Sequence, residues 1–185
     1  FIGGGLRTLF QAIETRINAT GGSVETAAGV TEIVAGDAAG VAVRAGGEVR
    51  WFDKVISTVP SHILRKLAPD LGLGMATAGQ APNFLGVVCL ALVLKKQLSP
   101  YYVTNLIERG LPFTGVIEIS SMTGCEELNG QHLVMLPRYD DPASPWFERP
   151  EAEVASEFLG ALRRVFPDVD QYVDRYFVHR ARHVQ

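Results

Sequence analysis

The apolar run FLGVVCLALVL at residues 84–94 decides how the fold of this chain is interpreted. Its eleven residues are too few for a transmembrane helix, which needs about 20. A short, continuous run rich in Val and Leu is typical of a strand that is buried on both faces. We therefore predict a buried strand here, and a sheet in the second half of the chain.

The residues that follow this run predict the rest of that sheet. We expect strands at residues 101–107, 115–120, 132–139 and 174–184. Pro150 suits the first position of a helix, and Glu151 and Glu153 in the first turn favour the helix dipole. Apolar residues at helical spacing give this helix one buried face: Val154, Phe158, Leu162, Val165 and Phe166.

The first half of the chain predicts one long helix and a set of short strands. The helix has an apolar face formed by Leu6, Leu9, Phe10, Ile13 and Ile17, and it ends at Gly21-Gly22. Strands are expected at residues 23–26, 29–35, 40–45, 48–52 and 54–59. A short helix should follow Pro60. The Gly- and Ala-rich residues 70–82 are the candidate boundary between two subdomains.

Composition and charge fit a folded protein. The chain has 185 residues, of which 47% are hydrophobic, and a net charge of −3. This apolar content excludes intrinsic disorder, and the slight acidity argues against nucleic acid as a main partner. Expected strands outnumber expected helices, and tight turns join several of them. We therefore predict an α+β fold with a mixed, largely antiparallel sheet and a few packing helices.

The two cysteines indicate a reducing environment. Cys89 lies inside the apolar run and is interpreted as a small core residue, whereas Cys125 lies beside Gly124 in an expected turn. No pattern supports a disulfide between them. We expect a cytoplasmic location, either free or at a membrane surface.

Complete catalytic and nucleotide-binding motifs are missing from the sequence. It contains neither G-x-G-x-x-G nor a Walker loop, and so no complete phosphate cradle. Gly4 and Gly5 lie at a helix start, where exposed amides can bind an anion or simply form a tight turn.

His179 and His183 lack a third ligand, so no metal site is predicted. Adjacent carboxylates such as Asp140-Asp141 are interpreted as solvated turns, and no catalytic residue is predicted.

Two segments carry a more specific signal. The first begins with Gly4-Gly5-Leu6-Arg7-Thr8-Leu9, continues through a helix to Gly21-Gly22-Ser23-Val24, and reaches Gly29-Val30-Thr31-Glu32-Ile33. The second is Phe52-Asp53-Lys54-Val55-Ile56-Ser57-Thr58-Val59-Pro60. In order and spacing they resemble the flavin-containing amine oxidase superfamily, which includes protoporphyrinogen oxidase-like and phytoene desaturase-like enzymes. The similarity is good over residues 3–67. It is weaker over the remainder, including residues 112–118.

The resemblance implies roles for particular residues in binding FAD. Val30 matches the family valine whose backbone meets the adenine end of the cofactor. Thr58, with its neighbours Ser57 and Pro60, matches the end of a strand that lies close to the cofactor. These positions chiefly offer backbone atoms, which explains why side-chain motifs are scarce.

The resemblance also implies that part of the family pattern is missing. Gly4 and Gly5 match the glycine pair where the chain passes between the cofactor and substrate regions, but the N-terminal pyrophosphate loop and the C-terminal flavin-closing segment have no match. Since the first methionine is Met75, we interpret the chain as the central piece of a larger enzyme. Residues 1–69 would contact the cofactor and residues 70–185 would bind substrate. We expect this piece alone to retain no FAD and to be inactive.

In this interpretation the larger enzyme removes a hydride from a C–N or C–C bond of an apolar substrate and passes it to FAD. The strands after Ala81 would form the wall of an apolar substrate cavity. Two alternatives stay open: a non-catalytic α+β module that binds an apolar ligand, and a protein-interaction domain. The expected partners are a small hydrophobic substrate and, through exposed apolar surfaces, other copies of the chain.

Overall fold

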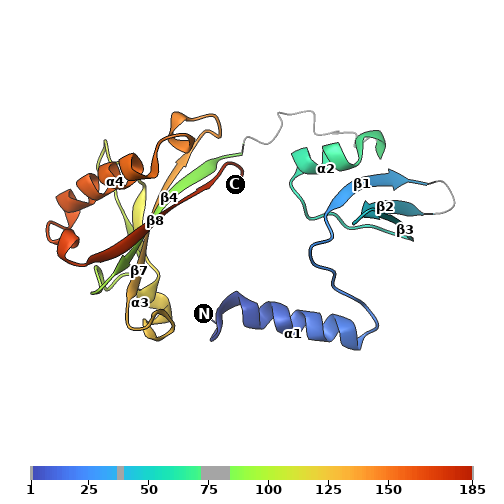
Figure 1. The fold of residues 1–185 in the computed structure, drawn as a ribbon, viewed down its shortest axis with the longest axis horizontal. Helices are drawn as coiled ribbons and strands as arrows, with labels where there is room; N and C mark the ends of the chain where they lie inside the picture. The colour runs from blue at the N-terminus through green and yellow to red at the C-terminus, as the bar shows by residue number, and fades with distance from the viewer. Residues whose placement is uncertain (1, 37–39, 72–83, 185) are drawn as a thin grey trace. The chain divides into compact units, whose positions relative to one another are not determined.

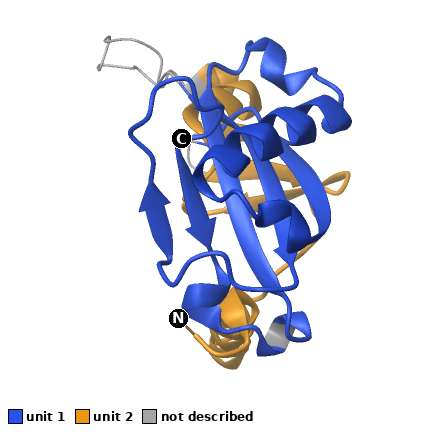
Figure 2. Ribbon diagram, turned by 90° about the vertical axis from the view of Figure 1, so that its left-hand side faces the viewer, with its two compact units in different colours: residues 1, 80–185 blue, residues 2–79 orange. Residues whose placement is uncertain are grey.

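The computed structural model describes residues 2–36, 40–71 and 84–184. These residues belong to two compact units, one within residues 2–79 and the other within residues 80–185 (Figure 2). The predicted boundary segment at residues 70–82 lies almost wholly outside the described residues. Each unit is therefore considered by itself.

The first unit contains a long helix and a small antiparallel sheet (Figure 1). Helix α1 spans Gly5–Ala19, and strands β1 (Val30–Ala35), β2 (Val41–Ala45) and β3 (Glu48–Phe52) pair in the order β1-β2-β3. Helix α2 (Ser61–Leu67) follows Pro60 and leads to a 3₁₀ turn at Pro69–Leu71. The predicted elements at these positions are confirmed.

Helix α1 has the predicted apolar stripe, but none of its residues is buried. Leu6 and Phe10 are 66% and 61% exposed, and Ile13 is 45% exposed. Self-association through such apolar surfaces stays a prediction.

Two strands predicted in this unit do not form. Residues 23–26 pair with no other described strand, and Ala27 adopts a left-handed φ of 58° that turns the chain immediately after them. Residues 54–59 likewise pair with no strand in the part of the chain that the structure describes. A strand needs a neighbour, and β1 and β3 are the two edges of this sheet with no further strand beside them among the described residues. Ile56 is consequently 91% exposed.

The second unit is a five-stranded antiparallel sheet with one long helix against it (Figure 1). Its strands are β4 (Gly86–Leu94), β5 (Val103–Asn105), β6 (Gly115–Glu118), β7 (His132–Asp140) and β8 (Val173–Ala181). They pair in the order β5-β6-β7-β4-β8. Short helix α3 (Ser120–Thr123) follows β6, and α4 (Glu151–Val165) precedes β8. Three 3₁₀ turns complete the unit: Glu126–Leu128, Pro145–Phe147 and Val169–Gln171.

The predicted buried strand is confirmed as β4, which pairs along its whole length with β7 on one side and β8 on the other. The predicted α+β class is also confirmed, and every strand pair is antiparallel. Residues 101–107 form a shorter strand than predicted, limited to β5. Pro150 lies one residue before α4 rather than at its first position.

One face of this sheet packs against α4 to form the main core. Val88, Leu90, Leu92 and Leu94 of β4 are fully buried on this face. They meet the predicted helix stripe, in which Val154, Phe158 and Leu162 are fully buried together with neighbouring alanines. The Phe158 ring lies 5.5 Å from the Phe113 ring and 5.6 Å from the Trp146 ring, measured between centroids. These contacts tie the loops before β6 and before α4 to the same core.

The loop between β7 and α4 is better ordered than a solvated turn, which corrects the prediction for Asp140. The Trp146 ring lies between two guanidinium groups, 4.5 Å from Arg138 and 4.2 Å from Arg149. Arg138 also donates to the Asp140 carboxylate at 2.7 Å, and Ser144 donates to it at 2.9 Å. Burial alone would raise the pKa of Asp140, but these hydrogen bonds hold it below its usual value.

Among the described residues, none of the helices combines the length and the apolar composition that crossing a membrane requires.

Replacing Phe158 by alanine should lower the free energy of unfolding by about 3–5 kcal/mol, because it leaves a cavity between α4 and the sheet. Phe177→Ala is a matched control in the same sheet, since that side chain is 48% exposed, and it should cost about 1 kcal/mol or less. Urea unfolding measures both values. Equal losses in the two variants would show that the α4 interface is not the main core.

Cys89 should resist thiol reagents until the protein unfolds. It is buried, and burial raises the pKa of its thiol to about 11, so the reactive thiolate is scarce at pH 8. The partly exposed Cys125 should therefore react first. A thiol titration at pH 8 checks this, with one fast group in the folded protein and two in urea. Two fast groups without urea would contradict the burial of Cys89.

Candidate functional site

The first unit contains a small cavity of about 180 Å³. It is lined by residues from β1, β2, the extended segment after β3, and α2: Val30, Ile33, Val43, Val55, Ile56, Ser57, Thr58, Val59 and Leu67. Helix α2 packs beside β1, which brings Leu67 to the strand that carries Val30. The walls are apolar except at Ser57 and Thr58.

Three of the predicted cofactor residues thus line one cavity, namely Val30, Ser57 and Thr58. They come from segments separated by the whole β2–β3 hairpin, so the fold and not the chain's local sequence brings them together. Pro60 does not line the cavity. It lies directly before α2, with φ −52° and ψ 144°, and redirects the chain from the extended segment into the helix.

Gly4 and Gly5 also lie elsewhere, at the start of α1. Both have left-handed φ values, 78° and 70°, which a residue with a side chain rarely adopts. A Cβ atom on Gly4 would also clash with Thr8 Oγ1. The glycine pair therefore forms the tight turn into α1.

The hydroxyl groups at the cavity suit a ligand that has an apolar ring and polar edges. The Ser57 and Thr58 side chains make no hydrogen bond to another described residue. Ser61 Oγ, at the start of α2, is buried and likewise has no partner among the described residues. Ser61 does not line the cavity, however, so Ser57 and Thr58 are the hydroxyl groups that a ligand there would meet. The described cavity thus combines an apolar wall with two hydroxyl groups.

The second unit has a different candidate surface, on the sheet face opposite α4. Because strand residues alternate and β4 sends its even-numbered side chains into the core, its odd-numbered side chains lie on this opposite face. The register extends the face across all five strands. We call it the open face, and in this register it comprises Val87, Cys89, Ala91, Val93, Val103, Asn105, Gly115, Ile117, Leu133, Met135, Pro137, Tyr139, Arg175, Phe177, His179 and Ala181.

The open face is mostly apolar, buried at its centre around Cys89 and Ala91, and exposed on its outer strands. Val103 and Tyr139 are both 42% exposed and Phe177 is 48% exposed. The Phe177 and His179 rings stack with their centroids 6.4 Å apart. Exposed apolar side chains gathered on one face are typical of a ligand or partner site.

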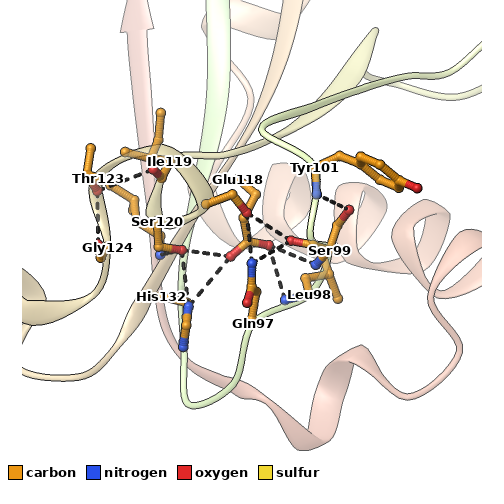
Figure 3. A network of polar contacts seen from close by, with 12 residues as sticks. Gln97, Leu98, Ser99, Tyr101, Glu118, Ile119, Ser120, Thr123, Gly124 and His132 are labelled. Carbon is orange, nitrogen blue, oxygen red and sulfur yellow. Dashed lines mark hydrogen bonds and ion pairs between the residues drawn. The ribbon is translucent and has the colours of Figure 1, made fainter. Parts of the chain in front are cut away.

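A buried polar cluster at the edge of the sheet was not predicted (Figure 3). Its centre is Glu118, the last residue of β6, whose side chain is fully buried. The sequence did contain a signal for it. Alternation from buried Val116 places residue 118 on the core face, where a carboxylate is exceptional.

The remaining sequence candidates form no catalytic or metal centre. His179 lies on the open face beside Phe177, and the His183 ring meets the Phe84 ring edge-on at 5.9 Å. In the part of the chain that the structure describes, no three His, Cys, Asp or Glu side chains gather closely enough to hold a metal ion.

Comparison with known proteins places the chain among flavoproteins. A family model described as flavin-containing amine oxidoreductase matches residues 1–183. A search of curated proteins finds no match. An oxidoreductase structure from Methanosarcina mazei is similar over 97% of this chain and 43% of its own, with 22% identity and a TM-score of 0.71.

Two further solved structures show the same fold. A candidate protoporphyrinogen oxidase from Exiguobacterium sp. 255-15 aligns with 12% identity and a TM-score of 0.72. Reduced UDP-galactopyranose mutase aligns with 16% identity and a TM-score of 0.69. Each alignment covers 95% of this chain and 38% of the other, so the chain spans less than half the length of the structures it matches. Because the match covers nearly every residue, the chain belongs to the flavin-containing amine oxidoreductase family.

Proposed function

We propose that this chain is the part of an FAD-dependent oxidoreductase that contacts the adenine end of the cofactor and holds an apolar substrate. The flavin, when bound, would accept a hydride from a C–N or C–C bond of that substrate. In this proposal residues 1–69 serve the cofactor and residues 70–185 serve the substrate.

The observation that carries the proposal is the meeting of Val30, Ser57 and Thr58 at one cavity. Val30 would contribute its backbone, and the two hydroxyl groups would bond the polar edge of the adenine. The apolar side chains around them, such as Ile33 and Val43, would cover the faces of the ring and exclude water.

The open face supports the second half of the proposal. Its Val, Ile, Met and aromatic side chains offer apolar contact over all five strands, and its polar members are Asn105, Arg175 and His179. A surface of this composition would bind an apolar substrate mainly by removing its surface from water. Chemistry would come from the flavin, since no described residue of the open face is a carboxylate, lysine or exposed thiol.

The 185-residue chain should purify colourless and should retain no flavin after it is mixed with FAD and desalted. The residues at the cavity would contact only the adenine end of FAD. Contacts to that end alone should bind FAD too weakly for the complex to survive desalting. Flavin absorbance of the desalted protein measures this. A yellow, stoichiometric complex would contradict the proposed division of the cofactor site.

The longer enzyme that contains these residues should purify yellow, and Thr58→Trp should lower its flavin content several-fold, because an indole fills much of the cavity. Lys54→Trp is the control, since Lys54 is exposed and does not line the cavity. The ratio of flavin to protein absorbance gives the result.

The oxidation itself is tested by adding apolar amines and cyclic hydrocarbon-like substrates to the longer enzyme without oxygen. Bleaching of the flavin by one of them supports hydride removal. A colourless longer enzyme, or equal flavin loss in Thr58→Trp and Lys54→Trp, would contradict the cofactor assignment.

A further inference from the structure

The exposed apolar stripe of α1 has the spacing of a seam between two paired helices. Four of its residues follow one another at alternating intervals of four and three positions, as in a coiled coil: Leu6, Phe10, Ile13 and Ile17. We call these four residues the α1 seam. No residue of α1 is buried, and an isolated helix of 15 residues is only marginally stable in water. A partner that covers the seam would therefore stabilise α1.

The two flanks of the α1 seam differ in charge. Arg7 and Glu14 each directly follow a seam residue in the sequence, so both lie on one flank, about two helical turns apart. Leu9 and Arg16 each directly precede a seam residue and lie on the other flank. Among the described residues, none forms an ion pair with Arg7 or Glu14. Both charges are thus available to a partner.

This charge pattern matches a second copy of the same helix in the antiparallel direction. When a two-fold axis relates two antiparallel helices, the same flank of each helix meets, and residue i faces residue j while j faces i. Arg7 then lies opposite the partner's Glu14, and Glu14 lies opposite the partner's Arg7. In a parallel pair unlike flanks meet, and Glu14 would face the apolar Leu9. The antiparallel pair is therefore the arrangement that compensates both charges.

The antiparallel arrangement also covers the α1 seam along its whole length. Because the partner runs in the opposite direction, Phe10 would pack against the partner's Ile13, and Leu6 against the partner's Ile17. The two-fold axis repeats each contact. The apolar layers and the flanking ion pairs thus agree on one register.

A membrane surface fits α1 less well than a second helix does. Helices that lie on a membrane have a polar face rich in Lys and Arg. The polar face of α1 is largely uncharged, with Thr8, Gln11, Thr15 and Asn18, and Glu14 adds a negative charge at its edge. An anionic lipid surface would leave this carboxylate without a favourable contact.

We propose that two copies of this chain associate through antiparallel packing of the α1 seam, with Arg7 of each copy paired to the partner's Glu14. The proposal goes beyond the flavin function and does not depend on it, since no residue of α1 lines the cavity at Thr58. The seam is short, so the dimer should be weak and should exchange with the monomer.

Sedimentation equilibrium of the complete 185-residue chain tests the proposal without flavin, and it should show a monomer–dimer equilibrium. Phe10→Ala should weaken dimerisation at least about 10-fold, because each copy loses an aromatic side chain from the seam. Alanine favours helix, so α1 should still form. Phe177→Ala is the matched control, since this phenylalanine is also exposed but lies on the open face, and it should leave dimerisation unchanged. A chain that stays monomeric, or equal losses in both variants, would overturn the proposal.

A charge exchange tests the register. Arg7→Glu and Glu14→Arg each bring like charges together across the two-fold axis, so each should weaken dimerisation about 3- to 10-fold. The double variant restores opposite charges and should dimerise like the original chain. Circular dichroism checks that the variants are folded, as expected for substitutions in a helix without buried residues. A double variant as weak as the single ones would overturn the proposal and indicate that something other than a second copy covers α1. A colourless longer enzyme would instead refute the flavin assignment and leave this result unaffected.

Discussion

The packing of α4 against one face of β4 is the interaction on which the second unit depends. Phe158 and Leu162 fill the space above Leu90 and Leu92, and each fully buried side chain of this size contributes about 1.5–3 kcal/mol. The rings of Phe113 and Trp146 join the same core from two loops. Because α4 covers only one face of the sheet, exposed apolar side chains such as Phe177 and Tyr139 remain on the other.

The chain carries few reactive side chains at either candidate site, which is consistent with its family. In a flavoprotein the cofactor performs the redox chemistry, and the protein provides shape, contact and exclusion of water. The cavity at Val30 and Thr58 and the open face both have this character, since their described residues are mostly aliphatic or aromatic. A search for catalytic motifs therefore finds little, although the family match covers nearly the whole chain.

The elements that the sequence predicts well are those whose burial pattern is local. The run at residues 84–94 and the stripe from Val154 to Leu162 each contain their own periodicity, so strand and helix are evident without knowledge of their neighbours. Residues 54–59 have an equally strong strand composition but form no ladder. Whether an extended segment becomes a strand depends on a partner elsewhere in the chain, and composition carries no information about that partner.

The candidate site residues also divide into those that the sequence pattern reveals and those that depend on distant parts of the chain. Val30, Ser57 and Thr58 could be selected from the order and spacing of a family pattern, and their meeting at one cavity depends on the β2–β3 hairpin that separates them. Glu118 was missed because the rule that buries apolar side chains treats a carboxylate as exposed. Its burial is possible only because the amides of Leu98 and Ser99, twenty residues away, converge on it.

The Glu118 cluster also shows why a fold of this type would retain a buried charge. A hydrophobic residue at position 118 could fill the same volume, but it could not hold the connection between β4 and β5 in one conformation, since apolar contacts are not directional. Hydrogen bonds are directional, and the chain from Glu118 through Ser99 to the Tyr101 amide uses two of them in sequence. The core thus sets which face of the sheet packs against α4. The polar cluster sets the conformation of the connection between β4 and β5.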